Sequence, residues 1–187
     1  QPVACDSCGP RYTYNDVFKV LRDLKSILRE TAALVHSGKT VAIKGTGGYH
    51  LLCDALNEEA VRMLRSNKQR ESRPFAVMFR DVEVLTEYCY LDHEESAELT
   101  SWRRPIMILK QRKQLAPSVS NGLNTTGAML SYMPVHYQLF RMLETPVIVL
   151  TSGNISDKPI ITDDDTAAAE LGRIAEGLIS YNRKIIN

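Results

Sequence analysis

The sequence predicts an α/β protein in which helices flank one open, mixed β-sheet. Short apolar runs alternate along the chain with segments whose apolar residues recur every three or four positions, which is typical of layered α/β folds. The runs at 40–43 and 147–150 are apolar or β-branched throughout, as expected of strands covered on both faces. Further short runs between 105 and 130 favour mixed over purely parallel pairing.

Each expected element rests on a local pattern. An apolar stripe from Val17 to Val35, followed by Gly38, predicts the first helix over 16–35. Acidic residues at the start of the last helix suit the positive end of its dipole. The other helices are expected over 58–67, 81–90, 94–102, 135–143 and 163–176, and the strands over 40–43, 75–79, 105–109, 127–130, 147–150 and 178–181. Residues 1–14 are expected to be a tail and 111–126 a polar loop.

The composition is that of one ordinary soluble domain. The chain has 187 residues, of which 44% are hydrophobic, enough to bury a core. A net charge of +1 gives no global field for nucleic acid or an anionic membrane. No apolar run approaches the length of a membrane span. Four cysteines without a secretion signal predict reduced thiols in a cytoplasmic protein, and the missing initiator Met predicts a fragment or a processed product.

A glycine-rich segment, 43–50, follows the first expected strand. Clustered glycines such as Gly47 and Gly48 let backbone amides form a concave nest for an anion. Lys44 adds a charge and His50 a titratable group. The segment lacks the GK[ST] ending of a Walker A loop. An anion site and a plain tight turn are equally good interpretations of this pattern alone.

A basic segment, 68–75, precedes the second expected strand. Lys68 and Arg70 lie two positions apart, so in an extended chain they would project to the same side. Two such cations beside a buried strand form a plausible phosphate clamp. A solvated charge run is the more ordinary interpretation.

A polar turn, 151–156, follows the buried strand at 147–150. Ligands of open α/β sheets gather beyond the carboxyl ends of strands. Ser152 and Asn154 would offer a hydroxyl and an amide there, and Gly153 would allow a ligand to come close. A turn or helix cap explains the same residues without any ligand.

Cys5 and Cys8 have the spacing of a zinc knuckle. Two thiolates cannot complete a tetrahedral site, and the chain has no second CxxC motif. We therefore expect the other ligands upstream of this sequence, and no metal bound by this fragment.

Together, these motifs resemble the signature of the YrdC/Sua5 superfamily: Lys-x-Arg before one strand and Ser-x-Asn after a later one. The amino-acid sequence of segment 43–55 resembles the HypF pattern IKGxGGFHLxCDA. Threonylcarbamoyl-AMP synthases have a PTETxYGLxxDA-like segment at this place. Segments 115–119, 127–136 and 151–156 also resemble HypF. The chain departs from the family at Arg73, where Lys is usual, at Ser131, where Pro is common, and at 181–183, where His-Asp-Arg is common.

The resemblance implies a YrdC-like fold over residues 15–187, with a twisted open mixed sheet and a concave basic cavity, and a zinc-finger remnant over 1–14. It implies an adenylate-forming domain of a carbamoyltransferase that joins carbamate, derived from carbamoyl phosphate, to ATP with Mg²⁺, zinc being needed only in the full-length protein. The implied partners are the acylphosphatase, zinc-finger and carbamoyl-transfer domains of the same chain. A hydrogenase-maturation protein would accept the carbamoyl group on a cysteine.

The resemblance also implies which residues form the site. The expected catalytic residues are Lys68, Arg70, Ser152 and Asn154. The expected ATP- and carbamate-binding residues are Lys44, Gly47, Gly48, His50, Arg73, Thr151 and Arg183. Two rival functions stay open: a threonylcarbamoyl-AMP synthase acting in tRNA modification, and a non-catalytic RNA-binding module, which the near-neutral charge disfavours.

Overall fold

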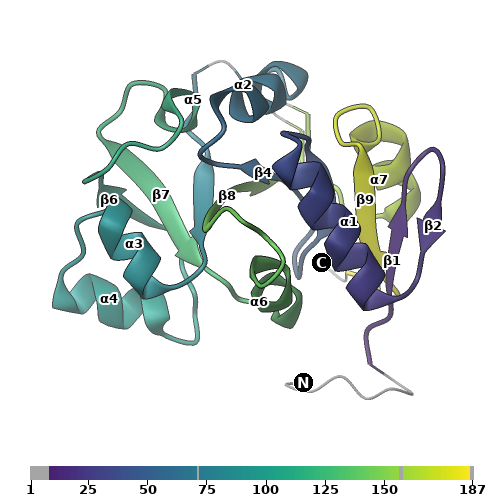
Figure 1. The fold of residues 1–187 in the computed structure, drawn as a ribbon, viewed down its shortest axis with the longest axis horizontal. Helices are drawn as coiled ribbons and strands as arrows, with labels where there is room; N and C mark the ends of the chain where they lie inside the picture. Colours follow the sequence, from purple (N-terminus) through teal and green to yellow (C-terminus); the bar gives the residue numbers. More distant parts are fainter. Residues whose placement is uncertain (1–8, 71, 156–157, 186–187) are drawn as a thin grey trace.

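The computed structural model describes residues 9–70, 72–155 and 158–185, and within them nine strands form one open sheet of order β2-β1-β9-β3-β4-β8-β5-β7-β6. Figure 1 shows β2 and β6 at opposite ends of the molecule. The β3–β9 and β5–β7 pairs are parallel and the other pairs are antiparallel, so the expected mixed sheet is confirmed. The strands are β1 Tyr12–Asn15, β2 Val20–Leu21, β3 Val41–Lys44, β4 Tyr49–Asp54, β5 Ala76–Phe79, β6 Met107–Lys110, β7 Thr125–Leu130, β8 Val147–Ser152 and β9 Gly177–Tyr181.

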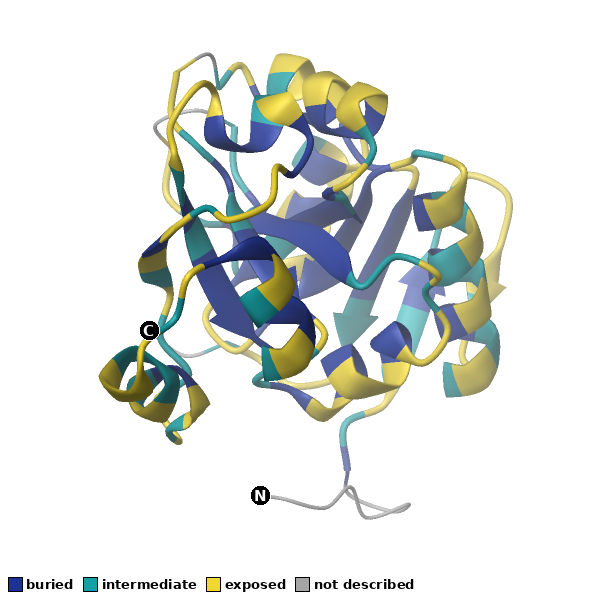
Figure 2. Cartoon of the chain, turned by 60° about the vertical axis from the view of Figure 1, so that its left-hand side comes forward, coloured by how far each residue is buried: buried dark blue, intermediate teal, exposed yellow. Residues whose placement is uncertain are grey.

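Helices cover the two faces of the sheet unequally. On one face, α1 (Leu24–His36) and α6 (Pro134–Phe140) bury a core with β3, β9 and β8. The other face packs against α2 (Glu58–Asn67), α3 (Val82–Tyr88), α4 (His93–Thr100), α5 (Pro117–Ser120) and α7 (Asp164–Leu171). Figure 2 shows the strands buried and the outer sides of the helices exposed. The expected coverage of both faces is therefore confirmed.

Strand alternation assigns each side chain to a face. On β4, Tyr49, Leu51 and Cys53 enter the core under α2, whereas Leu52 enters the core under α1. His50 lies on the same side as Leu52, because successive side chains of a strand point to opposite faces. Because of this alternation, the expected site residues do not all lie on the same face of the sheet.

The first helix is shorter than the apolar stripe suggested. It begins at Leu24, where Asp23 caps it by accepting a hydrogen bond from the Ser26 amide. Upstream, the Asp16 carboxylate accepts from the amides of Phe18 and Lys19 and turns the chain into β2. Val17, the first residue of the stripe, is 91% exposed, so the stripe joins two unrelated segments.

Other differences follow from local context. Strand β4 was expected to be part of a turn and loop, and β1 to be tail, but both find partners far along the chain in β8 and β9. The expected loop at 111–126 contains α5, and the last helix ends at Leu171 rather than at 176. The expected zinc half-site, Cys5 and Cys8, lies outside the described residues.

Leu64 offers a test of the core under α2. Its side chain is fully buried, so Leu64→Ala should lower the free energy of unfolding by about 2–5 kcal/mol. Met63, its neighbour, is 53% exposed, and Met63→Ala should change stability by no more than about 0.5 kcal/mol. Urea denaturation of both variants measures the difference. Equal losses would contradict this assignment of the two helix faces.

Candidate active site

A cavity of about 820 Å³ opens on the sheet face that α1 and α6 only partly cover. Residues of β4, β8, β5, β7 and β6 line it, and Arg70 and Tyr132 lie at its wall. No helix of the described chain packs over β6 here, since Ile106 and Ile108 are 58% and 77% exposed. The open half of the sheet therefore creates the cavity.

The cavity has a polar and an apolar end. The β4–β8 side presents Thr46, His50 and Ser152, beside Arg70. The β6 side presents Ile106, Ile108, Leu123 and the exposed indole of Trp102. Such a division suits a ligand with a charged part and a flat apolar part.

Lys68 lies behind the polar end rather than in it. It ends helix α2, is 1% exposed and does not line the cavity. Its Nζ donates hydrogen bonds to the carbonyl oxygens of Ser152 (2.6 Å) and Asn154 (2.7 Å) and to Asn154 Oδ1 (2.7 Å). Burial, with the nearby charge of Arg70, lowers the pKa of Lys68 to about 8. The ammonium thus holds the turn after β8.

Arg70 lines the cavity directly. Gln69 adopts φ 52°, a left-handed turn, so the segment is not extended as expected and Lys68 and Arg70 diverge. The Arg70 guanidinium lies 5.4 Å from the Phe75 ring centre and donates from Nη2 to the Pro74 carbonyl (3.0 Å). Its planar fork is well suited to phosphate or carboxylate oxygens.

The turn after β8 is rigidly held. Ser152 Oγ donates to Asn154 Oδ1 (2.8 Å), and Asn154 Nδ2 donates to the Lys158 carbonyl. At Gly153 a Cβ atom would lie 2.6 Å from the Tyr49 carbonyl oxygen, so only glycine fits. Ser152 and Thr151 line the cavity, whereas Asn154 does not.

Two imidazoles lie close to the polar end of the cavity, His50 in its wall and His136 buried. His50, paired with Ser152 across the β4–β8 ladder, lines the cavity, and burial lowers its pKa. His136 is 2% exposed, and burial, with repulsion from His50, lowers its pKa to about 3. Within the described ranges, Nδ1 of each ring has no hydrogen-bond partner. Both rings are therefore neutral near pH 7.

Lys44 lies on the opposite face of the sheet from the cavity. Its Nζ donates to Asp164 (2.6 Å) and to the Tyr181 carbonyl (3.3 Å), and the Tyr49 hydroxyl also donates to Asp164 (2.8 Å). The Tyr181 hydroxyl donates to the Gly45 carbonyl (2.9 Å). These contacts hold the glycine turn from behind and do not bring Lys44 to the cavity.

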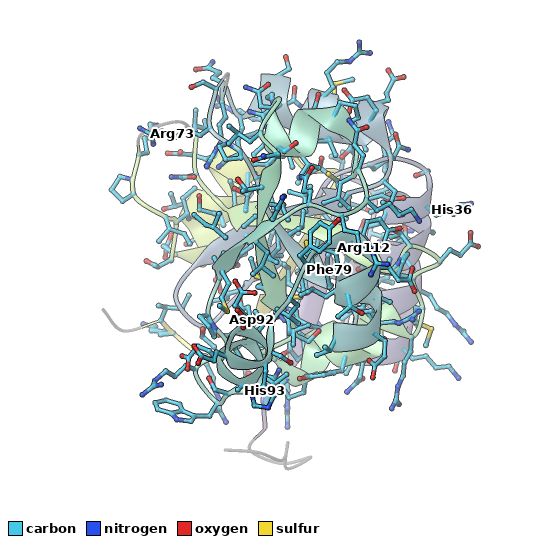
Figure 3. The ribbon with its side chains drawn as sticks, turned by 90° about the vertical axis from the view of Figure 1, so that its left-hand side faces the viewer. His36, Arg73, Phe79, Asp92, His93 and Arg112 are labelled. Atoms are coloured by element: carbon cyan, nitrogen blue, oxygen red, sulfur yellow. The ribbon has the colours of Figure 1, made fainter. Side chains whose placement is uncertain are left out.

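The other expected binding residues lie at its margins or beyond. Gly47 is exposed, and Gly48, at φ 152°, packs against Ile160. Figure 3 shows Arg73 at the periphery, on the loop before β5, whereas Phe79 lies inside the molecule. Arg183 is exposed after β9 and is not part of the cavity lining.

Two arginines on the cavity rim were not expected from the sequence. Arg103 and Arg104 follow Trp102 between α4 and β6, and Arg104 adopts φ 46°. A non-glycine residue in this region is uncommon and often marks a functional constraint. In the sequence, the consecutive Trp-Arg-Arg triplet could have indicated these two residues. It lies, however, at the end of the helix expected over 94–102.

The described residues contain no group of three or more His, Cys, Asp or Glu side chains placed to hold a metal. A magnesium ion at this site would therefore depend mainly on oxygen atoms of the ligand, as Mg²⁺ does in many nucleotide sites. The zinc ligands expected from the sequence lie in the part of the chain that is not described.

The fold and the cavity define a YrdC-like α/β domain. Residues 33–187 match the family model of Sua5, YciO and YrdC, whose description is telomere recombination. Carbamoyltransferase HypF2 of Cupriavidus necator is 39% identical over 85% of this chain. HypF of T. kodakarensis superposes on the whole chain with a TM-score of 0.93 and 42% identity. A full-length HypF in phosphate- and nucleotide-bound form gives 0.91 and 43%.

The chain belongs to the Sua5/YciO/YrdC family, in the branch represented by the HypF carbamoyltransferases. It spans 22% of the length of the Cupriavidus protein and 24% of each HypF structure, so it corresponds to one part of those larger proteins. Among its described helices, none is both long and apolar enough to cross a lipid bilayer.

The lowered pKa of Lys68 should make the free energy of unfolding depend on pH. Its pKa is about 8 in the folded chain and about 10.4 when unfolded, so between these values the unfolded state binds more protons. Stability attributable to Lys68 should therefore rise as pH increases from about 8 to 10, by about 3 kcal/mol at most.

The measurement is urea denaturation of the wild type and of Lys68→Met across this pH range. Comparing the two chains removes the contribution of tyrosines and thiols that titrate nearby. A difference in unfolding free energy that does not change with pH would contradict a buried, charged Lys68.

Proposed function

We propose that this domain forms carbamoyl adenylate from ATP and carbamate, as one step of carbamoyl transfer in [NiFe] hydrogenase maturation. The observation that supports this most is the polar end of the cavity, which Arg70 and Ser152 both line and behind which the buried Lys68 ammonium is bonded to the Ser152 carbonyl. A relative that is 43% identical was crystallised in a phosphate- and nucleotide-bound form. A cytoplasmic location is part of the same proposal.

The proposed step is a nucleotidyl transfer. A carbamate oxygen attacks the α-phosphorus of ATP and forms a new P–O bond, while the bond to the β-phosphate oxygen breaks and pyrophosphate leaves with its electron pair. Charge develops on phosphate oxygens, so preorganised cations and donors are the main source of rate acceleration. No covalent intermediate with the protein is needed.

The residues contribute in different ways. Arg70 is positioned to bind phosphate or carbamate oxygens, and Arg103 and Arg104 on the rim can contact the leaving pyrophosphate. Lys68 acts through the turn that it holds and through its charge, which is poorly screened because it is buried. Thr46 and the neutral ring of His50 contribute to the wall at the same end of the cavity.

The wider reaction requires parts beyond this domain. The chain covers about a quarter of its HypF relatives, so we place carbamoyl phosphate hydrolysis and the final transfer to a cysteine of an acceptor protein in other domains. Bound Mg²⁺, held mainly by oxygen atoms of the ligand and water, would lower the negative charge facing the attacking carbamate.

ATP–pyrophosphate exchange driven by carbamate tests the proposal. Arg70→Ala should lower the exchange rate by roughly 100- to 1,000-fold, because it removes a donor that stabilises the transition state. Lys68→Ala and Asn154→Ala should nearly abolish exchange by releasing the Ser152 turn. The matched control is Arg62→Gln, since Arg62 is exposed on the outer side of α2 and should leave the rate unchanged.

Threonine with bicarbonate provides the competing arm of that assay. If these substrates, and not carbamate, drove ATP turnover, the domain would be a threonylcarbamoyl-AMP synthase instead. Full exchange activity in both Arg70→Ala and Lys68→Ala would show that the site has been misplaced. Salt-sensitive RNA binding without any ATP binding would favour the RNA-binding alternative.

A further inference from the structure

Three side chains at the end of β8 form a directed chain of hydrogen bonds. Lys68 Nζ donates to Asn154 Oδ1 (2.7 Å), and Ser152 Oγ lies 2.8 Å from the same oxygen. Of the three, only Ser152 lines the cavity. The direction of each bond can be worked out from the chemistry of the groups.

Asn154 can adopt only one amide orientation here. An ammonium group donates and never accepts, so the Asn154 atom facing Lys68 must be the oxygen. The nitrogen then faces the Lys158 carbonyl, which only accepts. The opposite orientation would set two donors against each other and two acceptors against each other. The contacts of the Asn154 oxygen and of the Asn154 nitrogen therefore require the same orientation of the amide.

This orientation fixes the hydroxyl of Ser152. Asn154 Oδ1 has no proton, so the Ser152 hydroxyl must donate to it. A serine has a single donor, and here the turn uses it. Toward the cavity, the Ser152 oxygen can therefore only accept hydrogen bonds. Lys68 itself already has three acceptors, all of them uncharged oxygens.

We infer that Lys68 is a positioning residue which, through Asn154, makes Ser152 a hydrogen-bond acceptor toward the cavity and so selects a carboxylate ligand that has an N–H donor next to its carboxylate group. This inference rests on the proposed function and adds a basis for substrate choice. Carbamate has an amino group at that position, whereas acetate, which has the same shape, has a methyl group. An acceptor left unmatched by the methyl group disfavours acetate.

The arrangement gives a role to a buried ammonium whose three acceptors, among the residues that the structure describes, are all uncharged oxygens. Such a charge costs stability, and burial correspondingly lowers its pKa. A neutral donor at position 68, such as an amide, could rotate and accept as well, and the Lys158 carbonyl alone would then hold the orientation of the Asn154 amide. An ammonium donates and cannot accept, so it fixes the same orientation from the oxygen side of the amide.

The experiment compares ATP–pyrophosphate exchange driven by carbamate with exchange driven by acetate. Carbamate is supplied as ammonium carbamate, and the rate with bicarbonate alone is subtracted. In Ser152→Ala, the carbamate rate should fall roughly 5- to 150-fold, the range for one unmatched buried hydrogen-bonding group, while the acetate rate should not fall, because the methyl group has no hydrogen bond to Ser152 to lose. Lys68→Met should lower the carbamate-to-acetate ratio by a similar factor.

Asn154 supplies a matched pair of variants. Asn154→Asp and Asn154→Leu both lose the amide donor to the Lys158 carbonyl, but Asp keeps an acceptor for the Ser152 hydroxyl, so the carbamate-to-acetate ratio should be preserved in Asn154→Asp. Asn154→Leu has a similar volume but no acceptor, and the ratio should collapse. Thermal denaturation confirms that each variant is folded, and the pair remains informative even if Lys68→Met is unstable.

Several outcomes would overturn the inference. An unchanged ratio in both Lys68→Met and Asn154→Leu would do so, as would equal losses of the ratio in Asn154→Asp and Asn154→Leu. If Lys68→Met lost ATP affinity while keeping the wild-type ratio, Lys68 would be a direct phosphate ligand instead. If no carboxylate drove exchange in the wild type, the proposed function itself would be rejected, and this inference with it.

Discussion

The contact between the Lys68 ammonium and the turn after β8 connects the two sides of this molecule. Lys68 comes from helix α2, which covers one face of the sheet, while the cavity opens on the other face. The ammonium reaches the end of the central strand β8 and fixes the Ser152 carbonyl in place. The contact adds to the backbone hydrogen bonds that join Gly153 to Tyr49 and Ile161 and hold the same turn. The packing of α2 and the chemistry of the cavity thus depend on the same buried charge.

The neighbouring strands support that arrangement from behind. His50 pairs with Ser152 across the β4–β8 ladder, the Tyr181 hydroxyl holds the glycine turn before β4, and Lys44 is paired with Asp164 on the far face. The sheet therefore places groups that bind a ligand on one side and groups that fix the backbone on the other. Buried, fully bonded polar groups of this kind favour one conformation, because every alternative leaves a donor or acceptor unmatched.

Local sequence patterns predicted those features of the fold and the site that depend on neighbouring residues of the chain. Helix α2 was predicted over its full length, since Asn57 caps it and its apolar stripe is uninterrupted. The motifs also identified Arg70 and Ser152, which do line the cavity. Spacing could not reveal that Lys68 and Arg70 diverge, because the left-handed turn at Gln69 leaves no strong sequence signal. Nor could it place Lys44 on the far face, since that depends on the register of β3 with β4 and on a partner 120 residues away.

Trp102 gives the cavity an optical property of its own. It is the only tryptophan in the chain, and its indole is 87% exposed on the cavity rim, beside Arg103. Indole emission is sensitive to the polarity of its surroundings, and no second tryptophan adds a background. When the chain is excited at wavelengths that its eight tyrosines do not absorb, its emission therefore originates at the mouth of the cavity, and a ligand that covers this rim changes that signal.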